Sequence, residues 1–139
     1  NWKDIQLRKR YNSLLAYKRS KLANVLFTCE LNRRLGNGSS VRAFAVDPGL
    51  VNTCIGLKGT SGLVRWFWGI RSRRGVQPEQ AARTIIHLAG NPLEENEDEV
   101  YWKDCRPVCP SRYSLREDEA RRLWDCSERM CGIRFADRL

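Results

Sequence analysis

Histidine is almost absent from this chain, since His87 is the only one among 139 residues. Catalytic schemes that need two imidazoles, and zinc sites that combine paired cysteines with histidines, therefore lack their ligands. The six cysteines include no second close pair to complement Cys105 and Cys109. We expect reduced, mostly structural thiols and no bound metal.

Long apolar runs are missing as well. No stretch approaches the roughly 20 apolar residues needed to cross a bilayer, and the N-terminal residues form no apolar signal segment. The sequence also starts without an initiator methionine, so we expect it to begin inside a longer product.

The net charge is +9, but the basic residues do not form the continuous patch that a nucleic-acid site requires. Lys and Arg are scattered along the expected helices, and the aromatic residues beside the one basic cluster form no RNA-binding signature. We expect no nucleic-acid partner. Such an excess is more typical of a solvated surface or of attraction to acidic ligands and lipid headgroups. Contact with a membrane surface through Arg71, Arg73 and Arg74 therefore stays open.

Three helices are expected from apolar periodicity and from residues typical of helix ends. The first runs from about Ser13 to Leu35, with Asn12 or Ser13 as its N-cap. The second opens at Pro78 and has His87 on its exposed side, and the third begins at a capping box, Ser114 to Glu117. The buried sides are expected to be Ala81, Ala82, Ile85, Leu88 and Ala89 in the second helix, and Ala120, Leu123, Trp124 and Ser127 in the third.

Two short strands are expected between these helices. The first covers residues 41–46 and ends at Asp47-Pro48-Gly49, because proline cannot continue a ladder. The second covers residues 100–102. The resulting order of helix, strand, loop, helix, strand and helix implies an α/β fold built on a parallel sheet.

Tyr17 and Lys21 stand four residues apart at the head of the first expected helix, so their side chains share one face. A nearby ammonium favours the ionised form of a phenol, which suits a general acid or base at neutral pH. This spacing also arises by chance, and on most helices it marks a solvated pair. The pair gains weight from its combination with the Pro-Gly turn that ends the next strand.

This combination resembles the short-chain dehydrogenase/reductase superfamily. The sequence is similar to that of the retinol-dehydrogenase-like branch, which includes the WW-domain oxidoreductase. The similar stretches are residues 17–28, 46–53, 101–105 and 122–133. The resemblance implies that residues 1–139 are the C-terminal half of one doubly wound, Rossmann-type domain. That half contains the catalytic helix, the nicotinamide-side loop, a substrate loop around Trp66 to Trp68, and the last strand and helices.

The resemblance also implies hydride transfer between NAD(P) and a lipophilic alcohol, aldehyde or ketone such as a retinoid. Tyr17 would exchange a proton with the substrate oxygen, while Lys21 would favour the phenolate and hydrogen-bond the nicotinamide ribose. The Val51 backbone would lie near the carboxamide, and the Thr53 hydroxyl near the carboxamide or phosphate. Pro48 and Gly49 would line the nicotinamide. The branch favours NADP over NAD, and a place in the cytoplasm or on the cytosolic face of the endoplasmic reticulum.

The sequence departs from the family pattern upstream of Tyr17. The family's glycine-rich turn, its Asn-Ala-Gly stretch and its active-site Ser belong there, but the sixteen preceding residues contain none of them, and Ser13 and Ser20 are no substitutes. We therefore expect impaired catalysis. The alternative is a non-catalytic truncated form that pairs with itself or with a full-length relative through the first helix and the last strand region.

Overall fold

The computed structural model describes residues 2–51, 75–90 and 99–135. The chain divides into two compact units, one formed by Asn1–Ala45 with Pro110–Leu139 and the other by Val46–Cys109, and each is described by itself. In chain order the elements are a short 3₁₀-helix η1 (Trp2–Asp4), α1 (Ser13–Leu35), β1 (Ala45–Asp47), α3 (Pro78–Gly90), β2 (Tyr101–Lys103), β3 (Arg106–Pro107) and α4 (Glu117–Cys131).

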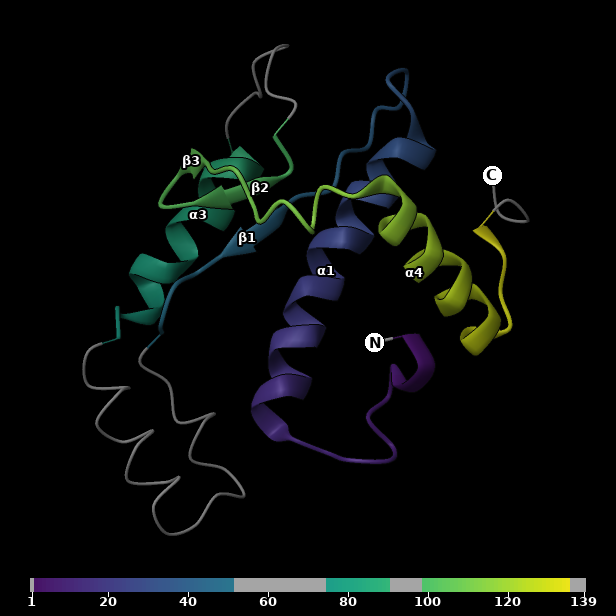
Figure 1. Ribbon diagram of the computed structural model, residues 1–139. Helices are drawn as coiled ribbons and strands as arrows, with labels where there is room; N and C mark the ends of the chain where they lie inside the picture. Colours follow the sequence, from purple (N-terminus) through teal and green to yellow (C-terminus); the bar gives the residue numbers. More distant parts are fainter. Residues whose placement is uncertain (1, 52–74, 91–98, 136–139) are drawn as a thin grey trace, which may run out of the picture. The chain divides into compact units, whose positions relative to one another are not determined.

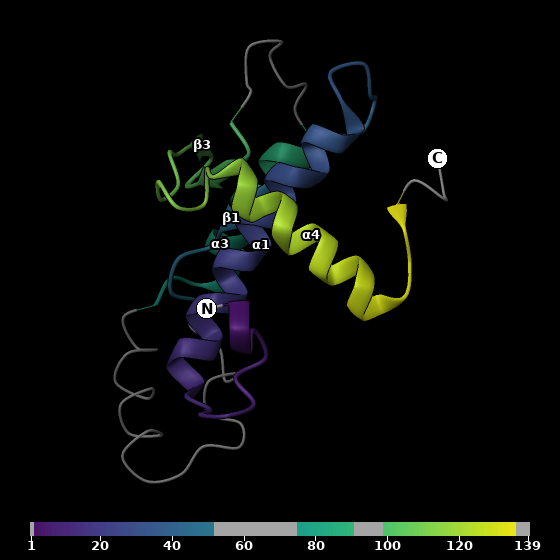
Figure 2. The same ribbon diagram turned by 45° about the vertical axis from the view of Figure 1, so that its right-hand side comes forward.

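The first unit is built on α1 and α4, which lie side by side in both views (Figures 1 and 2). Leu26 of α1 packs with Ala120 and Leu123 of α4, and all three are buried. Burying a leucine side chain stabilises a fold by about 1.5–3 kcal/mol. The core therefore lies on the side of α4 that the sequence predicts, and the residues packed around it are Trp2, Ile5, Leu22 and Ala23.

The bounds of α1 are those expected, and the structure decides between its two candidate caps. The Asn12 side chain accepts a hydrogen bond from the Leu15 amide at 2.9 Å, so Asn12 and not Ser13 is the N-cap. At the other end, Gly36 has a φ of +73° and donates its N–H to the Asn32 carbonyl at 3.0 Å. Glycine adopts this conformation without steric cost, which explains why the helix ends there.

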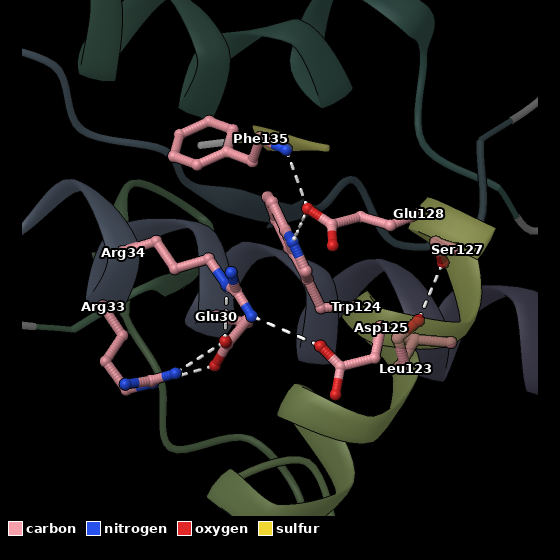
Figure 3. Close-up of polar contacts among 9 residues, drawn as sticks. All are labelled: Glu30, Arg33, Arg34, Leu123, Trp124, Asp125, Ser127, Glu128 and Phe135. Carbon is pink, nitrogen blue, oxygen red and sulfur yellow. Dashed lines mark hydrogen bonds and ion pairs between the residues drawn. The ribbon is translucent and has the colours of Figure 1, made fainter. Parts of the chain in front are cut away.

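A buried carboxylate near the end of α1 organises the contact with α4. Glu30 is 1% exposed and accepts hydrogen bonds from Arg33 and Arg34, at 2.6 and 2.7 Å (Figure 3). The Arg34 guanidinium also reaches Asp125 of α4 at 3.5 Å and lies 4.8 Å from the Trp124 ring centroid. Burial raises the pKa of Glu30, but the two guanidinium partners outweigh it and hold the pKa below its ordinary value.

The expected capping box at the start of α4 does not form. Ser114 is buried and donates its hydroxyl to the Ser111 carbonyl at 2.6 Å. A turn in which the Arg116 amide bonds the Tyr113 carbonyl separates it from the helix, and α4 begins at Glu117. The prediction was wrong because the Ser114 hydroxyl bonds a carbonyl within the preceding turn and does not cap the first turn of the helix. Gly132, in the left-handed conformation, ends α4 where the sequence indicates.

The second unit carries a three-stranded sheet with the order β1-β2-β3. β1 covers only the end of the expected strand at 41–46. Ala43, within that stretch, has its backbone N–H and C=O bonded at 2.8 Å to the Asn32 side chain, so these groups join no ladder. β2 forms one residue later than predicted. Together with the parallel bridge between Val51 and Val76, these strands and helices confirm the α/β class and match a partial Rossmann-type fold.

β3 was not expected from the sequence. It pairs antiparallel with β2 across a two-residue turn, Asp104-Cys105, in which both residues have positive φ, 51° and 59°. Such turns match the twist of a hairpin but usually contain Asn or Gly. Pro107 also argues against a strand, so the local sequence conceals this hairpin.

Helix α3 begins at Pro78 as predicted, but its buried side differs from the expected one. Thr84 is buried and its hydroxyl accepts the Cys105 amide at 3.0 Å, whereas Ile85 is 56% exposed and Ala89 is also exposed. His87, expected at the surface, is half-buried with its ring 5.9 Å from that of Trp102. The Cys105 amide needs a hydrogen-bond acceptor when it is removed from water. The Thr84 hydroxyl supplies this acceptor, so Thr84 is buried where apolar periodicity predicted Ile85.

Candidate functional site

Tyr17 and Lys21 meet on one face of α1, as their spacing predicts. The Lys21 Nζ atom lies 5.5 Å from the centroid of the Tyr17 ring. Tyr17 is 57% exposed, so a ligand can reach the phenol from solvent. Leu22 and Ala23, on the next turn of the helix, pack against the core and so anchor the backbone that carries the pair. The structure therefore brings the two side chains together at a position that a ligand can reach.

The turn after β1 exposes backbone at Gly49. This residue has a φ of +71°, and its N–H donates to the Asp47 Oδ1 atom at 2.9 Å. A Cβ placed on Gly49 would have no described atom within 4 Å. The turn, with Pro48 before the glycine, therefore leaves room for a flat group to approach the main chain, which is a role that glycine permits.

Val51 follows this turn and is tied to the start of the next described segment. It forms a parallel bridge with Val76, whose amide donates to the Leu50 carbonyl at 2.8 Å. This pairing fixes the Val51 backbone. Thr53 lies outside the described residues, as do Trp66 to Trp68 and Arg71, Arg73 and Arg74, so the roles expected for them stay predictions.

Two residues beside the turn escaped the sequence analysis. The Lys103 Nζ atom lies 3.3 Å from the Asp47 Oδ2 atom. Burial and, next to it, the neighbouring Asp47 carboxylate raise the pKa of Tyr101. Burial raises the pKa of Asp47, but the Gly49 amide and Lys103 hold it below the ordinary value. Asp-Pro-Gly is a turn signal that could have indicated the bond to Gly49. The partnership with β2 depends on strand register, which no local signal gives.

The predicted site residues are divided between the two units. Tyr17 and Lys21 belong to the first unit, and Pro48, Gly49 and Val51 belong to the second. Within the described ranges, no cluster of His, Cys, Asp or Glu is suited to hold a metal ion. The cysteines of these ranges are free thiols, and no helix in them is both long and apolar enough to cross a membrane.

Comparison with known proteins finds retinol dehydrogenases among the relatives of this chain. The chain is 40% identical over 130 residues to human retinol dehydrogenase 11, an alignment that covers 94% of this chain and 40% of that protein. It is 36% identical over 141 residues to human retinol dehydrogenase 14, covering 96% and 40%. Mouse retinol dehydrogenase 12 is 38% identical over 132 residues, covering 95% and 41%. The chain is a homologue of the retinol dehydrogenases.

This finding confirms the resemblance to the retinol-dehydrogenase-like branch of the short-chain dehydrogenase/reductase superfamily. The chain spans about 40% of the length of the curated relatives it matches. No family model matches the chain, and no solved structure matches it either.

Proposed function

We propose that this chain carries the proton-exchange and nicotinamide-side part of an NAD(P)-dependent oxidoreductase that interconverts a lipophilic alcohol and its carbonyl compound. The observation that carries the proposal is the exposed phenol of Tyr17 with the Lys21 ammonium 5.5 Å from its ring. It occurs in a chain homologous to proteins named retinol dehydrogenases. Those names support a retinoid as the substrate.

The residues present fit the nicotinamide end of the cofactor. The open backbone at Gly49 has room for a planar ring, with Pro48 and Val51 on either side of it in the chain. When bound, NAD(P) supplies the hydride. Tyr17 would then hold the proton that is exchanged with the substrate oxygen, and Lys21 would bind the ribose. The 139 residues contain no glycine-rich loop for the pyrophosphate.

The finer points of the proposal rest on the family resemblance. The resemblance favours NADP over NAD and implies that Thr53 contacts the carboxamide or phosphate. We also propose that the protein lies in the cytoplasm or on the cytosolic face of the endoplasmic reticulum.

Cofactor binding is the first test. NADPH and NADH are titrated into the purified chain while the fluorescence of its five tryptophans is recorded. Saturable quenching that weakens in Lys21→Gln, but not in the matched variant Lys18→Gln on the same turn, is the expected result. Equal affinity in both variants would contradict the role of Lys21, and no binding by a folded chain would contradict the proposed function.

A second candidate function is association without catalysis, with another copy or with a full-length relative. Leu14 and Leu15, on the first turn of α1, are 58% and 39% exposed, and exposed apolar side chains together favour an interface. Sedimentation velocity is expected to show a concentration-dependent dimer that the double variant Leu14→Glu, Leu15→Glu abolishes. A strictly monomeric, folded chain at all concentrations would contradict this candidate.

A further inference from the structure

We propose that Asp47, held by Lys103 and Tyr101 of β2, is a positioning residue that sets the Pro48-Gly49 turn for the nicotinamide ring. The proposal rests on the proposed function and deepens it. It adds three side chains, here called the Asp47 clamp, that act through the main chain of the turn and not by contact with the cofactor.

The two oxygens of the Asp47 carboxylate have different partners. Oδ1 accepts the Gly49 amide at 2.9 Å, while Oδ2 faces the Lys103 ammonium at 3.3 Å. Tyr101, on the same strand as Lys103, also interacts with this carboxylate. Because one rigid group carries these contacts, fixing it from β2 also fixes the amide of Gly49.

The turn needs such a device because glycine samples positive and negative φ about equally. Gly49 has a φ of +71° and no described atom within 4 Å of the position of a Cβ. The described side chains around Gly49 therefore do not hold its conformation sterically. The bond from its amide to Asp47 selects one conformation before any ligand binds. Preorganisation of this kind strengthens binding by lowering the ordering cost.

An ordinary surface ion pair would explain the Asp47–Lys103 contact alone. The two side chains are 32% and 44% exposed, and pairs this exposed contribute little to stability. A pair with no further role would leave the amide of Gly49 unaffected when Lys103 is changed. The Gly49 amide therefore distinguishes a clamp from a simple ion pair. Its behaviour is measured when Lys103, which faces the other oxygen of the Asp47 carboxylate, is substituted.

The test compares the purified chain with Lys103→Gln, with the rescue variant Lys103→Arg, and with Arg83→Gln as a control. Arg83 lies exposed on α3 of the same unit, so its variant removes one positive charge without touching the clamp. The first measurement is the ¹H–¹⁵N resonance and hydrogen exchange of the Gly49 amide without ligand. The second is the dissociation constant for NADPH.

In Lys103→Gln, we expect faster exchange and a shifted resonance at Gly49, together with about fivefold weaker NADPH binding, while Lys103→Arg and Arg83→Gln resemble the unchanged chain. An unaltered Gly49 amide in Lys103→Gln overturns the clamp. An altered amide with unchanged NADPH affinity overturns its positioning role. If the unchanged chain binds no NADPH, the proposed function fails, and the ligand-free Gly49 amide still decides whether the clamp exists.

Discussion

The Lys21 ammonium lies 5.5 Å from the centroid of the Tyr17 ring, on the same face of α1 and one turn further along. The two side chains meet because the helix brings positions four apart together. The phenol remains 57% exposed. The proposed proton exchange depends on this exposed pair.

Removal of the Tyr17 hydroxyl tests that role. We expect Tyr17→Phe to lower the rate of NADPH-dependent reduction of a retinaldehyde by at least about 100-fold, because general acid–base catalysis contributes about 10²–10⁴-fold. The rate is followed by NADPH absorbance, in the chain and in a fusion to the upstream part of a retinol dehydrogenase. Tyr11→Phe, at a residue 73% exposed, is the control. Retained turnover in Tyr17→Phe would show that another group moves the proton.

The core between α1 and α4 is tested by cavity formation at Leu26, which is 4% exposed. Leu26→Ala is expected to lower the free energy of unfolding by about 2–4 kcal/mol, measured by urea denaturation. Leu14→Ala, on the exposed side of the same helix, should change it by less than about 0.5 kcal/mol. Equal effects at both positions would mean that α1 does not bury this face.

Glu30 makes the stability of the first unit dependent on pH. Its pKa is held below the ordinary value of about 4.3 by Arg33 and Arg34, against the effect of burial. Its contribution is therefore fully present above that ordinary value and is lost as the pH falls through the lowered one. We expect Glu30→Gln to lower the free energy of unfolding by about 1 kcal/mol at pH 7, a figure reduced for the partial exposure of Arg33.

The measurement for Glu30 is urea denaturation of the unchanged chain and of Glu30→Gln across pH 3 to 7. The difference between the two should shrink towards the acidic end, where the carboxyl of Glu30 becomes protonated. A difference that stays constant over the whole range would contradict the assigned ion pairs.

Gly49 is expected to resist substitution because of its backbone conformation. A left-handed φ costs a residue with a Cβ about 1–2 kcal/mol, and Gly49 has a φ of +71°. Gly49→Ala should therefore destabilise the second unit by about 1 kcal/mol and weaken NADPH binding. Gly38→Ala is the matched control, because Gly38 does not have a positive φ and its Cβ would also meet open space. Equal effects of both variants would remove the conformational argument.

Features that depend on neighbouring residues could be predicted from the sequence. Asn12 and Gly36 bound α1 because capping involves groups within a few residues, and Pro78 begins α3 for the same reason. The meeting of Tyr17 and Lys21 follows from helical geometry alone. The same kind of local signal was wrong at Ser114, whose hydroxyl bonds the Ser111 carbonyl in a competing turn.

The sequence by itself determined the helices, the α/β order and the family-like stretches that contain Tyr17, Lys21 and the Pro-Gly turn. Only the tertiary structure decided that Thr84 and not Ile85 faces the hairpin, that Asn32 holds Ala43 out of the sheet, and that Lys103 faces Asp47. The physical reason is separation along the chain. A contact between distant residues depends on strand register and helix rotation. Both are set by side-chain packing and by the need of buried backbone N–H and C=O groups for hydrogen-bond partners.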